Sequence, residues 1–235
     1  MSYYPLRFFG PGLIIAVDGQ TLSLRSRKQL ALLVYLAVEH SIAHSRDSLM
    51  ALFWPEESTA NAQNNLRVTL SRLRDITTKL GCVEGLLVAD RNNVQLQPAW
   101  VERADVNHFD RLLDATRQHA HSARNQCAAC QTALQTAVEL YQGSFLEGFG
   151  LEDCAAFEEW LFMQRERLHL LALEAYADLA TYAEAKGDLL AGRSYAQRQI
   201  EIDPLRESAY RQQMRILSRQ GERSLALAVF ERCRL

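Results

Sequence analysis

The sequence predicts a mainly α-helical fold in two parts, a small domain of helices and β-hairpins followed by an all-helical domain. Residues 1–97 hold two strand pairs with turn-forming residues between the strands, and three helical apolar patterns lie between the pairs. After Pro98 the apolar residues follow a helical period almost without interruption. Near the end, Gly187 and Gly221 are 34 residues apart, which is the period of a tetratricopeptide repeat.

Composition excludes several classes of protein. The 235 residues are 48% hydrophobic and 23% charged, as expected of a folded chain rather than a disordered one. The longest apolar run, Leu30–Val38, is far shorter than the roughly 20 residues of a membrane-spanning helix. The N-terminus has no signal-peptide pattern, and the five cysteines have no disulfide-framework spacing. We therefore expect a reduced, cytoplasmic protein that makes no membrane contact.

The first strand pair and the first helix come from the N-terminal 37 residues. Apolar residues at 6–17 precede Asp18-Gly19, a favoured hairpin turn, and residues 21–24 are the predicted returning strand. Ser26 is placed to cap a helix. Its apolar residues recur with helical spacing at Leu30, Leu33, Val34 and Ala37.

Two more helices follow. Ser45 is the predicted N-cap of a short second helix, which Pro55 stops. The third helix is predicted to begin at Ser58 or Thr59 and to end at Gly81.

A second hairpin closes the first domain. Residues 86–89 and 94–97 flank the polar turn Asp90–Asn93. Strands, three helices and a terminal hairpin, in this order, predict a winged helix-turn-helix in residues 1–100. In that fold the third helix enters the major groove of DNA and the hairpin is the wing.

The third helix has one apolar side and one polar side. At about 100° per residue, Leu66, Leu70, Leu73 and Thr77 share the predicted core side. Every residue of an adjacent stripe can donate a hydrogen bond: Asn64, Arg67, Ser71, Arg74 and Thr78. Such side chains recognise base edges in the major groove.

Further candidate DNA contacts lie beside this stripe. Arg72 and Lys79 are further round the helix and better placed for phosphates. Thr69 and, in the hairpin, Arg91 complete the predicted DNA-binding set.

The charge distribution agrees with an anionic partner. Residues 1–100 carry 10 Lys+Arg and 8 Asp+Glu, so their net charge is 10 − 8 = +2. The remaining 135 residues carry 16 and 20, so theirs is 16 − 20 = −4. A local basic patch is the electrostatic footprint of nucleic acid, but a solvated helix face is an alternative interpretation.

Residues 101–235 predict a second, all-α domain that resembles a tetratricopeptide array. In that repeat a small residue five positions after the turn glycine lets two helices approach closely, and Gly192 and Ala226 occupy those places. Pro204 is placed to stop a helix. The chain ends inside its last predicted helix, so we expect it to be a fragment of a longer protein. The predicted helices cover residues 105–118, 125–142, 153–186, 189–202, 205–220 and 223–235.

Several segments resemble known regulators. Leu66–Arg74 resembles the recognition helix of OmpR-type winged helices, and Leu49–Pro55 resembles their second helix. Lys28–Leu33 resembles the first helix of one branch, the Streptomyces antibiotic regulatory protein (SARP) family. The second half resembles that branch at residues 104–109, 133–146, 203–207 and 220–227.

This resemblance implies an OmpR-type winged-helix DNA-binding domain at residues 1–100 and a bacterial transcriptional activation domain at 101–235. It implies an activator that binds promoter direct repeats in double-stranded DNA, as a homodimer at least on DNA, and that recruits RNA polymerase. The sequence departs from the family at the hairpin, where Asn92-Asn93-Val94 replaces the usual Gly-Tyr, and at Tyr141, where Trp is common.

Other functions were weighed against regulation. A tetratricopeptide-like scaffold without DNA binding is the main alternative. A zinc ion could be held by two histidines and two cysteines, namely His119, His121, Cys127 and Cys130. The two cysteines alone could instead act as a redox pair. The Ala-rich helical context of the cysteines favours plain packing, so we predict no metal and no cofactor. No phosphate-binding loop or nucleophile motif is present, so we expect no catalysis.

Overall fold

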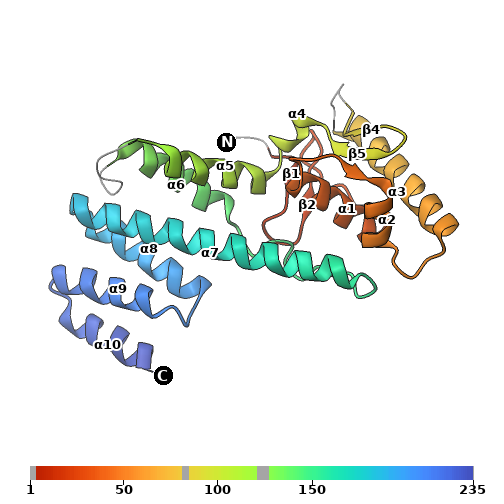
Figure 1. Ribbon diagram of the computed structural model, residues 1–235. Coiled ribbons are helices and arrows are strands. Elements are labelled where there is room, and N and C mark those ends of the chain that lie inside the picture. The colour runs from red at the N-terminus through yellow and green to blue at the C-terminus, as the bar shows by residue number, and fades with distance from the viewer. Residues whose placement is uncertain (1–3, 81–84, 121–126, 235) are drawn as a thin grey trace. The chain divides into compact units, whose positions relative to one another are not determined.

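The computed structural model describes residues 4–80, 85–120 and 127–234, without the side chains of Thr77 and Thr78. These residues form ten helices and five short strands, and the predicted mainly α-helical fold class is confirmed (Figure 1). By packing, the chain divides into two compact units. The first consists of Met1–His108 and Gln142–Arg167, and the second of Phe109–Tyr141 and Leu168–Leu235. The domains expected from sequence, 1–100 and 101–235, stay a prediction.

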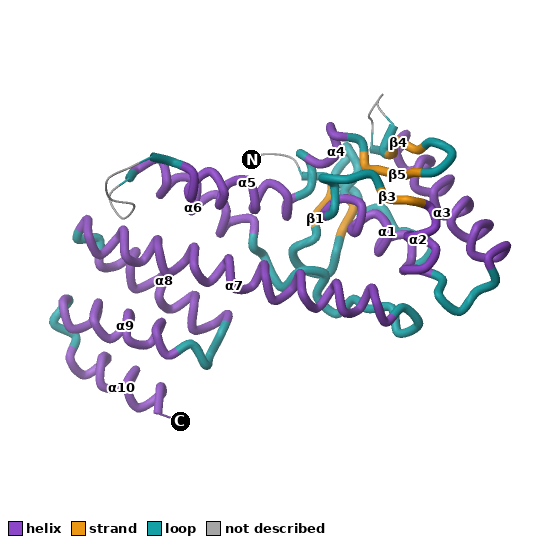
Figure 2. Tube along the Cα trace, viewed as in Figure 1, coloured by secondary structure: helices purple, strands orange, loops and turns teal. Residues whose placement is uncertain are grey.

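The first unit has the element order of a winged helix. All five strands of the described residues lie in it (orange in Figure 2). Its elements are β1 (Leu6–Arg7), β2 (Leu13–Ile14), α1 (Arg27–Val38), β3 (His44–Ser45), α2 (Arg46–Phe53), α3 (Thr59–Lys79), β4 (Leu87–Ala89), β5 (Asn93–Leu96) and α4 (Pro98–Val101).

Two antiparallel sheets form in this unit. The hairpin predicted around residues 90–93 is confirmed as β4 and β5, with Val88 opposite Gln95. The strand β3 was not predicted, and it extends this sheet in the order β3-β5-β4. At the N-terminus β2 pairs with β1, so the predicted return strand at 21–24 is reduced to a bridge between Ile15 and Thr21.

The helix starts follow the predicted caps. Ser26 Oγ accepts the backbone N–H of Gln29 at 3.3 Å, and Ser45 Oγ accepts that of Ser48 at 3.0 Å. Each bond satisfies a donor that the first helical turn leaves unpaired.

The three leucines on the predicted core side of α3 are buried, whereas the side chain of Thr77 lies outside the described part of the structure. Leu66, Leu70 and Leu73 are at most 1% exposed. They belong to the core that also buries Leu33 of α1 and Leu49 of α2. The buried side fixes which residues of α3 face outward.

Residues 142–167 complete the first unit although they are distant from it in sequence. The backbone N–H of Leu146 donates to Phe8 O at 2.9 Å, and that of Gly10 donates to Ser144 O at 2.9 Å. Phe157 is fully buried, and its ring centroid lies 5.4 Å from that of Phe53 in α2. This segment therefore supplies core to the winged helix.

The second unit is built from helices alone. The helices α5 and α7 each begin in the first unit and continue into the second. No helix of the described residues is both long and apolar enough to cross a membrane. The helices are α5 (Asp105–Gln118), α6 (Ala128–Leu140), α7 (Ala155–Lys186), α8 (Leu189–Ile202), α9 (Glu207–Arg219) and α10 (Arg223–Arg234).

The repeat-like turns are as predicted. Gly187 and Gly221 adopt φ of 78° and 83°, a left-handed conformation that favours glycine after a helix. Gly192 lies close to the preceding helix α7 and the following helix α9, since a Cβ there would be 3.5 Å from Ala180 O and 3.4 Å from Ile216 Cδ1. The small residue thus permits close helix packing.

Candidate nucleic-acid interface

The predicted polar stripe of α3 lies on the outside of the first unit. Asn64, Arg67, Ser71 and Arg74 are all exposed, as are Arg72 and Lys79 beside them. Arg67 Nη2 donates to Asn64 Oδ1 at 2.9 Å, which joins two members of the stripe.

Two other residues of the predicted DNA-binding set, Thr69 and Thr78, are not seen as exposed side chains. Thr69 is only 6% exposed, unlike the other described members of the set on α3, and its predicted contact with DNA stays a prediction. The reason for this burial is helical phase, because Thr69 lies about 40° from Leu73 on the core side. The side chain of Thr78 lies outside the part of the structure that is described.

Arginines from three segments meet beside the stripe. A surface hollow of about 450 Å³, which we call the hairpin hollow, brings together Arg67 of α3, Arg91 of the β4–β5 turn and Arg46 at the start of α2. Its other lining residues are Ser45, Asp47, Met50, Gln63, Leu66 and Asn92.

The hairpin turn is fixed to α2 at this point. Arg46 Nε and Nη2 donate to Asp90 O at 3.3 and 3.0 Å, and Arg46 N donates to Asn92 O at 2.8 Å. The backbone N–H groups of Asn93 and Asn92 also donate to the Asp90 carboxylate, and they hold the pKa of Asp90 below its usual value. Arg91 is thereby presented next to Arg67 on a constrained turn.

A second hollow, of about 560 Å³, joins α3 to the N-terminus of α1. In this α1 hollow, Asn64 and Arg72 of the predicted set face Arg27 and Lys28. Lys28 Nζ is 2.6 Å from Asp153 Oδ2, so Lys28 is held by an ion pair. The remaining lining residues are Ser26, Trp54, Asn65, Val68, Thr69 and Leu151.

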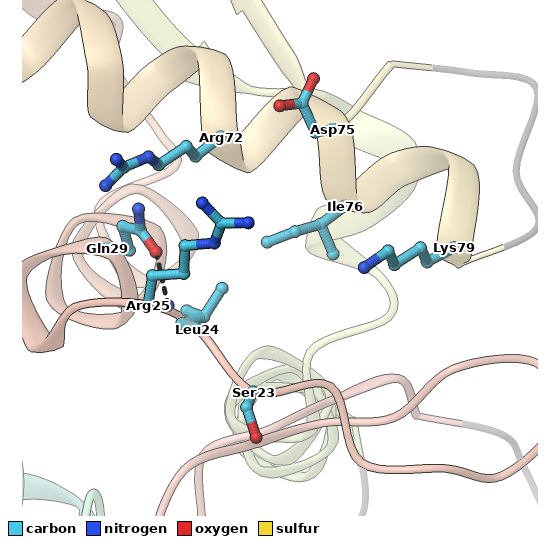
Figure 3. A pocket seen from close by; sticks show the side chains of 8 residues that line it. All are labelled: Ser23, Leu24, Arg25, Gln29, Arg72, Asp75, Ile76 and Lys79. Atoms are coloured by element: carbon cyan, nitrogen blue, oxygen red, sulfur yellow. Dashed lines mark hydrogen bonds between the residues drawn. The ribbon is translucent and has the colours of Figure 1, made fainter.

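A third hollow, of about 270 Å³, lies at the C-terminal end of α3 (Figure 3). Arg72 and Lys79 project into it from α3, and Arg25 projects from the segment before α1. Asp75 is the acidic residue among these lining cations. Gln29 Oε1 accepts the backbone N–H of Arg25 at 2.9 Å, which holds this segment against α1.

The predicted set is thus divided by the structure. Arg67 and Arg91 share the hairpin hollow, and Arg72 lines both of the others. Ser71 and Arg74 are exposed on α3 but line none of these three hollows.

Four cations beside α3 were missed by the sequence analysis, namely Arg25, Arg27, Lys28 and Arg46. A signal for three of them was present. Arg27, Lys28 and Arg46 directly follow the caps of α1 and α2, and the first turn of α1 has no acidic residue. Cations oppose the dipole at a helix N-terminus. Their presence there indicates a surface that attracts anions.

The comparisons with known proteins agree with a regulator. The model of the bacterial transcriptional activator domain matches residues 104–235, which is more than half of the chain. The chain belongs to this family. The family is a regulatory one, and the resemblance to SARP-type regulators is confirmed.

One relative and one solved structure match this family member over both units. The regulatory protein AfsR of Streptomyces coelicolor is 28% identical over 219 residues, which are 91% of this chain and 20% of AfsR. The chain therefore spans about a fifth of the length of that relative. A solved structure of Mycobacterium tuberculosis EmbR, in complex with a low-affinity phosphopeptide, has a TM-score of 0.70 at 20% identity. It covers 96% of this chain and 57% of the EmbR chain. EmbR thus supports the fold of the activator-family chain.

Proposed function

We propose that this family member is a sequence-specific DNA-binding activator and that α3 is its recognition helix. The observation that carries the proposal is the set of guanidinium groups on and beside α3. Arg67 and Arg74 of α3 and Arg91 of the hairpin turn are exposed, and the half-buried Arg46 of α2 lies beside them. Arg72 lies on the neighbouring side of α3.

The positions of these residues suit different contacts with DNA. Asn64, Arg67, Ser71 and Arg74 project from the middle of α3, where side chains of a helix in the major groove contact base edges. Arg46 and Arg91 flank this helix and suit the phosphates on the side of the wing. The N-terminus of α1 adds positive charge on the other side.

The second half of the chain suits protein contacts better than DNA. Residues 101–235 have a net charge of −4, which disfavours phosphates. We propose that the chain binds promoter direct repeats as a pair and that its helical part contacts a second protomer and RNA polymerase.

The first test selects bound sequences from a random duplex library with the full chain and then titrates the recovered duplex. We expect Arg67→Ala and Arg74→Ala to weaken specific binding, each by about 1–3 kcal/mol if the arginine contacts a base. Arg211→Ala is the matched control, because it removes an equal charge from the exposed surface of α9. Wild-type affinity in both α3 variants would contradict the assignment of the recognition helix.

A second test compares duplexes with one repeat and two repeats at two salt concentrations. Paired binding predicts cooperative occupation of the two-repeat duplex, and phosphate contacts predict weaker binding at higher salt. Non-cooperative binding would contradict pairing. Absence of binding at low salt would favour the scaffold alternative.

A further inference from the structure

Three potential metal ligands converge between α5 and α6. His119 Nδ1 lies 3.3 Å from Cys130 Sγ and 3.4 Å from Cys127 Sγ. One ligand atom from each of the three residues lies within 4.8 Å of the others. Neither cysteine is part of a disulfide.

Local structure explains the convergence. Cys127 is the N-cap of α6 and Cys130 lies in its first turn, so both thiols are at the same end of the helix. His119 directly follows the last residue of α5. The imidazole beside the end of α5 therefore lies next to the thiol pair at the start of α6.

The spacing matches a tetrahedral zinc ion. With Zn–S of about 2.3 Å and Zn–N of about 2.0–2.1 Å, two tetrahedral ligands are about 3.6 Å apart for S and N and about 3.8 Å for two S atoms. The observed N–S distances are within a few tenths of an ångström of the first value. All three ligand atoms lie within 4.8 Å of one another, so metal binding needs the two thiols to approach by at most about 1 Å.

The three potential ligands differ in burial. Cys130 is 2% exposed, Cys127 is half-buried and His119 is exposed. One side of the cluster thus rests on the helical core and the other is open to solvent. An ion can enter from that side and keep a water as its fourth ligand.

We propose that His119, Cys127 and Cys130 bind Zn²⁺ in this regulator. Two thiolates and an imidazole favour zinc over the hard cations Mg²⁺ and Ca²⁺, which take oxygen ligands. Binding releases a proton from each thiol and ties the end of α5 to the start of α6. The sequence alone favoured ordinary packing of the two cysteines, and the position of His119 changes that interpretation.

The test uses the full chain, reduced and stripped of metal with a chelator. Titration with Co²⁺ should give one equivalent of binding, with thiolate-to-cobalt charge-transfer absorption and the strong visible bands of tetrahedral cobalt. Zn²⁺ should displace the Co²⁺ and raise the melting temperature of the chain.

Variants identify the ligands. Cys127→Ser and His119→Ala should weaken zinc binding by at least about 100-fold, since even partners that only orient metal ligands cost 10–100-fold. Both positions are at least partly exposed, so both variants should fold. Cys233→Ser is the matched control, because Cys233 is a half-buried free thiol of α10, and it should bind zinc as the wild type does.

Three results would overturn the proposal. The first is the absence of stoichiometric Co²⁺ or Zn²⁺ binding by the reduced chain. The second is unchanged affinity in Cys127→Ser and His119→Ala. The third is formation of a Cys127–Cys130 disulfide under mild oxidation together with no metal binding before oxidation.

Discussion

The two compact units differ in how far apart in the sequence their packed segments lie. The first unit joins segments that are more than 100 residues apart, as when Leu146 N donates to Phe8 O at 2.9 Å. In the second unit, α8 and α10 each follow the preceding helix after a tight turn with a left-handed glycine, Gly187 and Gly221. The first unit depends on its distant segment, whereas the helices at the end of the second depend mainly on their neighbours.

Buried polar groups show the same contrast. In the first unit the Asp105 carboxylate accepts backbone N–H groups of Phe8 at 2.8 Å and Phe9 at 3.2 Å, which lie almost 100 residues away. In the second unit Gln199 Nε2 donates to Gln212 Oε1 at 2.9 Å, only 13 residues away. Damage to a single segment should therefore spread further in the first unit than in the second.

The largest effect should come from cutting the chain after residue 100. This fragment lacks Asp105, Phe145 and Phe157, which are buried in the first unit, so we expect it to lose cooperative unfolding. A chain that ends at residue 222 lacks only α10, which has no buried residue, and should unfold cooperatively. Circular dichroism melting of both fragments checks this, and a cooperative melt of the 1–100 fragment would contradict the role given to residues 142–167.

A smaller effect should follow from Leu73→Ala in α3. Leu73 is 0% exposed, so the substitution should lower the free energy of unfolding by about 2–5 kcal/mol. Leu227→Ala in α10 is the matched control, because Leu227 is 66% exposed and should change stability little. Urea unfolding measures the free energy of unfolding of both variants. Equal losses of stability would contradict the burial of Leu73 and the exposure of Leu227.

Asp105→Asn should cost about 1–3 kcal/mol, because an amide cannot accept all the backbone N–H groups that the carboxylate accepts. Burial raises the pKa of Asp105 to about 7, although the N–H groups of Phe8, Phe9 and Val106 lower it. The folded pKa lies above the unfolded value of about 3.9, so the folded state holds more protons between these values.

Stability contributed by Asp105 should accordingly fall as pH rises from about 4 to about 7 and then level off. The advantage of the wild type over Asp105→Asn should shrink across that window. Urea unfolding at several pH values tests the sign. An advantage that grows with pH would show that the N–H donors outweigh burial.

The smallest effect should come from Gly192→Ala in α8. The added methyl would meet Ile216 Cδ1 at 3.4 Å and Ala183 Cβ at 3.6 Å, which are ordinary contacts. Alanine also favours a helix by about 1 kcal/mol over glycine, so stability should rise by up to that amount. Gly192→Leu should instead destabilise the second unit, because a larger side chain does not fit against Ile216 and Ala183. Thermal melting of both variants tests this, and an unchanged melting temperature for Gly192→Leu would show that the helices are not closely packed here.

The sequence by itself determined the local features of this protein. The bounds of α5 and α8 are as predicted, Ser26 and Ser45 cap the predicted helices, and the leucines of α3 are buried. Caps, turns and helical periodicity act over a few residues, so they are visible in the sequence. The same logic correctly placed Arg67 and Arg74 on the outside of α3.

Only the tertiary structure decided which distant residues meet. It added β3 to the hairpin sheet, placed residues 142–167 in the first unit and brought Arg46 and Arg91 beside Arg67. It also brought His119 to Cys127 and Cys130. These arrangements depend on chain segments returning to one another through packing, and no short-range pattern in the sequence records where a returning segment will lie.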